Sequence, residues 1–235
     1  MNVSAFRERL QYPERWDASR APKASRIVAL IERRRGRLGA DRTLEIGCST
    51  CGMTQVFRSH FGRVTAIDVD VTALMTCGPA FERVLASATA LPFRHEAFDV
   101  LIANHTLEFV RGVPKALREM ERVLRADGLV YLAAVNRLKF VLARLLPGRL
   151  KRAFYDLFHS GESHIGHPLA YWEWRERLRR FEVTDGTLDV LAYPDSSDPP
   201  AAIRIARRIP PAILRILAPL FPSWVFYLRK APPTS

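Results

Sequence analysis

The chain has 235 residues, 48% of them hydrophobic, and a formal net charge of +12 at pH 7. A chain of this length can bury roughly 70% or more of its unfolded surface, so its core needs no disulfide bonds. Three cysteines are an odd number, which argues against a secreted disulfide framework and favours the cytoplasm. The N-terminus lacks the apolar run of a signal peptide, and the apolar stretch 209–228 contains Arg215 and four prolines, so we expect neither export nor a transmembrane span.

The first predicted element is a helix that follows Pro22. Apolar residues Ile27, Leu30 and Ile31 recur there at helical spacing, so one face should pack against the core. Short apolar runs and helical patterns then alternate along the chain. The predicted strands are 42–47, 63–68, 83–87, 98–104 and 128–135, and the predicted helices between them are 54–61, 71–77 and 114–124.

This alternation predicts the α/β class. Strands and helices at such spacing form βαβ units, whose sheet is parallel and covered by helices on both faces. Near the C-terminus, 181–191 and 224–230 have the pattern of two closing strands, which suit an antiparallel sheet edge. We therefore predict a doubly wound, Rossmann-like and mostly parallel sheet of seven strands, with the last strand antiparallel.

A candidate ligand site lies where the first two predicted strands end. The first strand ends at Gly47, and a polar turn leads into the next helix. In doubly wound folds, ligands bind at the carboxyl ends of strands, where a glycine lets the backbone come close. Asp68 ends the second strand 21 residues later, an offset typical of a carboxylate that binds ribose hydroxyls. The dinucleotide pattern G-x-G-x-x-G is absent.

An ordered series of segments places this site in a wider pattern. The segments are LEIGCSTCG, VTAIDVD, ATALPF, AFDVLIANHTLEFV and RVLRADGLVYL. Together they resemble the class I S-adenosylmethionine-dependent methyltransferases, particularly the branch with quinone-biosynthesis and other small-molecule enzymes. The resemblance covers about 40–136. It implies one methyltransferase domain over 1–235, with an N-terminal helical cap (1–40), a cofactor-binding core (41–136) and an acceptor-side segment with the closing strands (137–235).

The resemblance also implies roles for single residues. Glu45 and Gly47 match the acidic residue and first glycine of the family's cofactor loop, and Asp68 matches the acid that binds the ribose. Ala88 and Leu91 fall in the segment that lines the adenine, with a backbone amide facing the ring edge. The full implied set of S-adenosylmethionine-binding residues is Glu45, Gly47, Cys48, Ser49, Gly52, Asp68, Val69, Ser87, Ala88, Leu91 and Asn104.

The sequence departs from the family pattern at three places. Ser49 and Cys51 occupy the second and third loop glycines, and Gly52 is displaced by one position. Ser87 stands where an aspartate often holds the adenine amino group. These changes leave a second hypothesis open, in which the chain is a catalytically degenerate cofactor-binding or scaffold protein of the same fold.

Cys48 and Cys51 form a C-x-x-C pattern at a strand-to-helix turn. A helix N-terminus lowers thiol pKa values in redox proteins, so a redox pair is an alternative interpretation. The downstream strands fit a methyltransferase better. A zinc site of this type needs a second ligand pair, so we expect no metal here.

Candidate catalytic residues lie in two places. Asn104 and His105 match the end of the fourth strand, nearest the reactive methyl group, and Glu108 follows closely. A second group contains His159, Glu162, His164 and His167. These residues could bind a metal, supply a general base, or be ordinary polar residues of a loop. We expect His105, Glu108 and His164 to be the catalytic candidates.

The positive charge concentrates in 1–42 and 137–180, with net +6 in each. Apolar residues in 138–158 and 203–221 alternate with arginines, as in an amphipathic element at an anionic membrane surface, although a helix covering the sheet would look the same. On the membrane interpretation the protein is cytoplasmic and peripheral at the inner face, and its acceptor is a lipid, isoprenoid or lipid-linked sugar. Nucleic acid is disfavoured because no zinc-finger, RNP-like or helix-turn-helix pattern is present.

Overall fold

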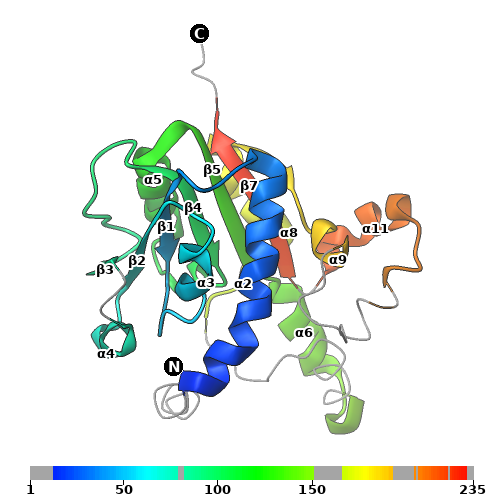
Figure 1. Cartoon of the computed structure of the whole chain (residues 1–235). Coiled ribbons are helices and arrows are strands. Elements are labelled where there is room, and N and C mark those ends of the chain that lie inside the picture. The colour runs from blue at the N-terminus through cyan, green and yellow to red at the C-terminus, as the bar shows by residue number, and fades with distance from the viewer. Residues whose placement is uncertain are drawn as a thin grey trace.

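The computed structural model describes residues 13–78, 82–150, 166–192, 204, 206–221 and 223–231. Its centre is a seven-stranded sheet of order β3-β2-β1-β4-β5-β7-β6 (Figure 1). The strands are β1 (Arg42–Ile46), β2 (Arg63–Asp68), β3 (Glu82–Leu85), β4 (Phe98–Asn104), β5 (Leu124–Val135), β6 (Phe181–Asp185) and β7 (Ser223–Lys230).

The pairing of these strands confirms the predicted mixed sheet. Strands β1 to β5 pair in parallel, whereas β7 runs antiparallel to both of its neighbours, β5 and β6. The last eight residues of β5, 128–135, are all buried, as a strand covered on both faces requires. Both predicted closing strands are present at this end of the sheet, but the first ends at Asp185 and residues 189–192 are helical, where the prediction continued the strand to 191.

Helices cover the two faces, as Figure 1 shows. The helices are α2 (Pro13–Arg35), α3 (Thr54–Arg58), α4 (Val71–Thr76), α5 (Val113–Val123), α6 (Arg137–Leu145), α8 (Tyr171–Arg177), α9 (Asp189–Ala192) and α11 (Pro211–Leu217), with 3-10 turns η1 (Leu107–Phe109), η2 (Leu178–Arg180) and η3 (Ala218–Leu220). Leu117 and Trp174 pack α5 and α8 on one face. Ile27 and Phe57 pack α2 and α3 on the other. Among the helices described, none has the length and apolar character of a membrane span.

Helix α2 differs from the prediction, which began after Pro22. It starts at Pro13, and Pro22 lies inside it. A proline inside a helix removes one hydrogen bond and costs about 3 kcal/mol. The fully buried Ile27, Leu30 and Ile31 further along hold the helix against the sheet, so this local cost does not end it.

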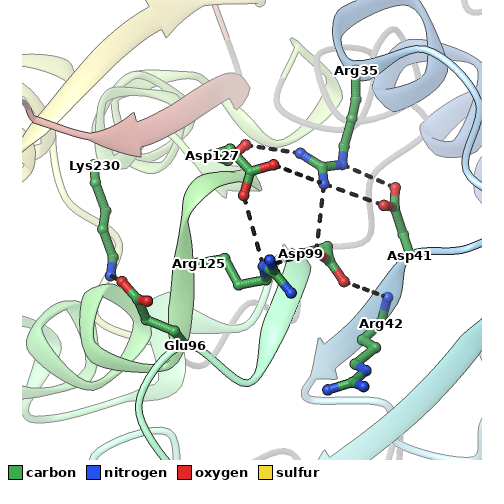
Figure 2. A network of polar contacts seen from close by, with 8 residues as sticks. All are labelled: Arg35, Asp41, Arg42, Glu96, Asp99, Arg125, Asp127 and Lys230. Atoms are coloured by element: carbon green, nitrogen blue, oxygen red, sulfur yellow. Dashed lines mark hydrogen bonds and ion pairs between the residues drawn. The ribbon is translucent and has the colours of Figure 1, made fainter.

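The amino end of the parallel strands is held by a network of charges (Figure 2). Arg35, the last residue of α2, donates from Nε to Asp41 Oδ2 at 2.9 Å and from Nη1 to the Asp127 carbonyl at 2.8 Å. Asp99 lies 3.7 Å from Arg35 Nη2 and 3.3 Å from Arg125 Nε. The network therefore connects α2, the residue before β1, β4 and β5.

Candidate functional site

The carboxyl ends of β1, β2, β4 and β5 meet at one edge of the sheet because these strands are parallel neighbours. Gly47 follows β1 directly, Asp68 is the last residue of β2, and Asn104 is the last residue of β4. The residues predicted from three separate segments therefore share this edge. It is the edge where ligands bind in open α/β sheets.

Gly47 begins the turn after β1 and has a backbone that favours glycine. Its φ is +80°, and a Cβ at this position would overlap the side chain of Thr106. That threonine is fixed because its Oγ1 donates to the Ile46 carbonyl at 2.9 Å. The amides of Gly47 and Cys48 both donate to the Ile67 carbonyl, at 2.8 and 3.0 Å, so the turn is bound to β2.

Two further residues of this turn have left-handed backbone. Ser49 has φ +51° and Cys51 has φ +61°. They are the two positions where the family pattern has glycine. The turn therefore keeps a glycine-like conformation while carrying side chains, at an energetic cost of about 1 to 2 kcal/mol per residue. Gly52, the displaced glycine, is buried beside them.

Asp68 connects the first two loops. Its Oδ2 accepts a hydrogen bond from the Ser49 amide at 2.8 Å, and its Oδ1 accepts one from the Asp70 amide at 3.0 Å. A carboxylate has about four acceptor positions, so each oxygen keeps one for a ligand. Val69, the next residue, is 70% exposed.

Glu45 lies beneath the turn, almost completely buried within β1. Its Oε2 accepts a hydrogen bond from Thr54 Oγ1 at 2.5 Å. Burial raises the pKa of Glu45 to about 7, against the opposing effects of the Thr54 hydrogen bond and the positive charge of Arg20. Arg20 comes from α2 and was not predicted as a site residue. No local sequence pattern indicates it, because the packing of α2 brings it here.

The predicted adenine segment lies beside Asp68, since the Ala86 amide donates to the Asp68 carbonyl at 3.0 Å. Ser87 Oγ is 2.9 Å from Thr89 Oγ1, and Ala88 is buried. Leu91, in the same segment, is buried. Its amide donates to Glu119 Oε2 at 2.9 Å, so the amide that the prediction places against the adenine would be another one of this segment.

His105 and Glu108 form a pair just beyond β4. Asn104 Nδ2 lies 3.8 Å from Met53 Sδ, and the next residue, His105, has φ +53°. The His105 Nδ1 atom is 3.4 Å from Glu108 Oε1, and the His105 side chain is 31% exposed. Glu108 is almost fully buried and accepts a hydrogen bond from the Val135 amide at 3.3 Å. The carboxylate is thus fixed at the end of β5 and faces the imidazole.

The second histidine group is only partly described. The His167 amide donates to the Glu108 carbonyl at 2.6 Å, which brings the start of the segment before α8 to the same edge. His159, Glu162 and the catalytic candidate His164 lie outside the described residues. Their predicted roles stay predictions.

The arrangement of the cysteines differs both from a chain without disulfides and from a redox pair formed by Cys48 and Cys51, the two possibilities that the sequence suggested. Cys51 forms a disulfide with Cys77, 26 residues later, and Cys48 is a buried free thiol. The structure therefore contains a disulfide where none was expected, and the C-x-x-C pair is not the one joined. Sequence spacing missed this pair because the packing of α4 against the turn, rather than local spacing, sets the distance to Cys77.

A cavity of about 720 Å³ lies at the opposite, amino edge of the sheet. Arg94, Arg118 and Lys230 are among its lining residues, with Glu96 and Glu121 between basic side chains. None of the predicted site residues lines it. It is therefore separate from the site at the carboxyl edge.

Comparison with known proteins agrees with the fold. Residues 44–132 match the family model described as "Methyltransferase domain". The chain is 23% identical over 154 residues to a malonyl-[acyl-carrier protein] O-methyltransferase of Coxiella burnetii, covering 65% of this chain and 50% of that protein. It is 29% identical over 125 residues to a probable S-adenosylmethionine-dependent methyltransferase of Mycobacterium tuberculosis, covering 52% and 46%.

A solved structure extends the likeness beyond the matched domain. The plantazolicin methyltransferase BamL, determined with a triazolic desmethylPZN analog and SAH, superposes with a TM-score of 0.64 at 13% identity, covering 98% of this chain and 91% of that one. At this identity the likeness shows the fold alone. The chain spans about half the length of the curated relatives it matches.

The matched domain contains the turn after β1, Asp68 and the His105–Glu108 pair, which are the features built from the residues above. The strand order of the sheet and the two methyltransferase relatives point to the same kind of domain. Residues 44–132 therefore form a domain that matches the methyltransferase family, and the chain as a whole has the fold of a solved methyltransferase.

Proposed function

We propose that the chain transfers a methyl group from S-adenosylmethionine to a small, amphiphilic acceptor. One observation carries the cofactor part of the proposal: the Ser49 amide binds the Asp68 carboxylate at 2.8 Å, which joins the turn after β1 to the acid after β2. A ligand bound at this edge would contact both loops at once. The single-domain organisation over 1–235 is part of the same proposal.

The residues at the edge fit an adenosyl group. Asp68 keeps one acceptor position on each oxygen, which suits the two hydroxyls of a ribose. Gly47 carries no side chain, and Thr106 fills the place that a Cβ would take, so the turn after β1 packs closely against the residues after β4. Arg20 adds a positive charge near Glu45, which suits the carboxylate of a methionine moiety. When bound, S-adenosylmethionine supplies an electrophilic methyl group.

His105 is the proposed general base, and Glu108 is the residue that positions it. The Nδ1 atom is buried and faces Glu108 at 3.4 Å, while the ring as a whole is about one third exposed. Their contact is close enough for an ion pair but does not have hydrogen-bond geometry, so the carboxylate acts through its charge, which favours a proton on Nδ1 and leaves Nε2 as the proton acceptor. Such a base removes the proton of an acceptor hydroxyl during methyl transfer. His164 stays a second candidate.

The amphiphilic acceptor is favoured by exposed apolar side chains on the segment after β5 and before β7. Leu145 near α6 and Ile216 on α11 are 77% and 78% exposed. Arg144 and Arg215 lie next to them in sequence. Asn136 joins the two segments, because its Nδ2 donates to the carbonyls of Pro219 and Phe221 at 3.1 and 2.7 Å. This combination suits an anionic membrane surface and a lipid-like acceptor at the inner face.

Turnover tests the enzymatic part. The full-length protein, S-adenosylmethionine and a bacterial lipid extract should release S-adenosylhomocysteine. His105→Asn should lower kcat by about 10² to 10⁴-fold while cofactor affinity stays unchanged. Normal turnover in His105→Asn would remove the proposed base.

The membrane part needs its own experiment. Sedimentation with vesicles of phosphatidylglycerol and phosphatidylcholine should pellet the protein with the anionic vesicles, and Ile216→Glu should reduce this binding. Leu85→Glu is the matched control, because Leu85 is also exposed but lies on β3. Failure to pellet with either vesicle would contradict the membrane surface.

The rival function is a cofactor-binding or scaffold protein without turnover, which Cys51 and Ser87 motivate. On that hypothesis, the double variant Cys51→Gly with Ser87→Asp should bind the cofactor more tightly than the natural chain. Unchanged affinity would remove its motivation. Cofactor binding by the natural chain together with S-adenosylhomocysteine release would favour the enzyme.

A further inference from the structure

All three cysteines of the chain gather at the turn after β1. Cys48, Cys51 and Cys77 are each at most 4% exposed, and their sulfur atoms lie within 4.8 Å of one another. Cys51 and Cys77 are joined, with their Cα atoms 5.4 Å apart, and Cys48 keeps its thiol. Three sulfurs with one disulfide form a group whose covalent state can change.

The two ends of the disulfide lie on the two elements that frame the candidate cofactor site. Cys51 is in the turn that contains Ser49. Cys77 is the C-cap of α4, the helix that starts after Asp70, and its amide donates to the Leu74 carbonyl at 3.1 Å. The disulfide and the Ser49–Asp68 hydrogen bond therefore join the same two segments of the chain. Both connect the loop after β1 to the residues after β2.

The backbone of the turn depends on such support. Ser49 and Cys51 adopt left-handed conformations that cost free energy for residues with side chains. Such conformations persist only where the surrounding structure holds them. Cys51 itself is held by its amide, which donates to the Cys48 carbonyl at 3.0 Å, and by the bond to Cys77. Loss of that bond leaves the turn free to relax toward ordinary backbone angles.

We propose that Cys51 and Cys77 are a reversible thiol–disulfide site that sets the cofactor affinity of the loop. The exchanging reagents are low-molecular-weight disulfides and thiols. In oxidation, one protein thiolate attacks the reagent disulfide and releases one reagent thiolate. The second protein thiolate then attacks the mixed disulfide and releases the other. The protein loses two electrons and two protons, and one reagent disulfide becomes two thiols.

Cys48 explains why the bond stays on this pair. Its thiol donates weakly to the Ser49 carbonyl at 3.7 Å. Burial raises the pKa of Cys48 far above the ordinary value for a thiol, with the negative charges of Glu45 and Asp68 adding to the effect and Arg20 opposing it. A thiol that stays protonated is a poor nucleophile, so Cys48 does not compete for the disulfide.

The cofactor and the bond stabilise each other on this proposal. If the oxidised turn binds S-adenosylmethionine more tightly than the reduced turn, then bound cofactor favours the disulfide by the same factor. In a reducing compartment disulfides are transient. The thiol–disulfide pair would therefore lower the affinity for the cofactor when thiols are abundant and restore it under oxidising conditions. The ligand identity rests on the proposed function, whereas the behaviour of the turn does not.

The test compares the oxidised and reduced full-length protein by calorimetric titration with S-adenosylhomocysteine. Alkylation after denaturation counts the thiols, one in the oxidised form and three in the reduced form. Reduction should weaken binding by about tenfold, the effect of one unsupported left-handed residue. Equal affinity of the two forms would overturn the proposal.

Three variants separate the cross-link from other effects. Cys77→Ser should bind like the reduced protein and ignore reductant. Cys51→Gly removes the backbone penalty, so it should bind like the oxidised protein and also ignore reductant. Cys48→Ser is the matched control and should keep the natural response. A lost response in Cys48→Ser would assign the exchange to another pair and overturn the proposal.

Hydrogen exchange gives a readout that does not need the cofactor. Amides of residues 47–53 should exchange faster after reduction, whereas those of β5 should not change. If no form binds S-adenosylhomocysteine but this difference appears, the proposed function fails and the covalent control of the turn stands. If exchange is the same in both forms, the control of the turn is overturned.

Discussion

The two edges of the parallel strands hold their loops by different means. At the amino edge, Arg35 reaches Asp41, Asp99 and Asp127, so charged side chains satisfy one another (Figure 2). Of the four non-glycine residues with left-handed backbone among those described, Ser49, Cys51 and His105 lie at the carboxyl edge, and Glu96 lies at the amino edge. Strained backbone concentrates where ligands bind because a loop shaped for a ligand is not shaped for its own stability. The amino edge therefore stabilises the fold, and the carboxyl edge holds the proposed cofactor site.

The largest expected effect is that of Gly47→Ala at the carboxyl edge. The added Cβ would overlap Thr106 and force a residue with a side chain to φ +80°. We expect a loss of about 2 to 5 kcal/mol in the free energy of unfolding, measured by urea denaturation.

Gly36→Ala is the matched control for this change. Gly36 has φ +90°, but a Cβ there would meet no atom within 4 Å. The free energy of unfolding of this variant should fall only by the cost of left-handed backbone for a residue with a side chain, about 1 to 2 kcal/mol. Equal losses in the two variants would show that the contact with Thr106 is unimportant.

The comparison of the edges also shows what sequence can predict. Strands β1, β2, β4 and β5 were predicted because continuous apolar runs mark strands buried on both faces, whereas β3, predicted from a shorter apolar run, is mostly exposed. Gly47 and Asp68 were predicted because their offset reflects the length of one βαβ unit. Arg20 and Cys77 were missed because helix packing brings them to the turn. The bond from the Leu91 amide to Glu119 was likewise not predicted, because it depends on where α5 lies.

The second effect is a pH dependence from Glu45. Its pKa is raised from 4.5 to about 7 by burial, so the folded state holds a proton that the unfolded state releases. This contribution is fully present below pH 4.5 and is lost as pH rises through about 7. It amounts to at most about 3 kcal/mol. Urea denaturation at pH 5 and pH 8 should show a smaller decline in Glu45→Gln than in the natural chain. Identical declines would contradict the buried, protonated carboxyl.

A third substitution tests whether the amino edge affects the stability of the fold without affecting cofactor affinity. Arg35→Met removes the centre of the amino-edge network and leaves Asp41 and Asp99 without it. We expect a loss of about 2 kcal/mol in the free energy of unfolding, since charged hydrogen bonds that are mostly shielded from water disappear. Cofactor affinity, measured by calorimetry below the unfolding temperature, should stay unchanged. A weakened cofactor affinity would contradict the conclusion that the two edges have separate roles.

The smallest effect should come from the exposed pair Lys230–Glu96, with Nζ 2.9 Å from Oε1. The Lys230 bond lowers the pKa of Glu96, but water screens the pair. Glu96→Gln should change thermal stability less than Arg35→Met does, and the change should vanish in 1 M salt. A salt-independent loss as large as that of Arg35→Met would show that the amino edge acts as one unit.

Calorimetric titration with S-adenosylmethionine tests the cofactor cradle most directly. The natural chain should bind, and Asp68→Ala should bind about 10 to 100-fold more weakly, because charge-assisted hydrogen bonds to the ribose are lost. Asp99→Ala, the same change at the amino edge, should bind like the natural chain. Absence of heat with the natural chain, or undiminished affinity in Asp68→Ala, would contradict a nucleoside site between the turn after β1 and the end of β2.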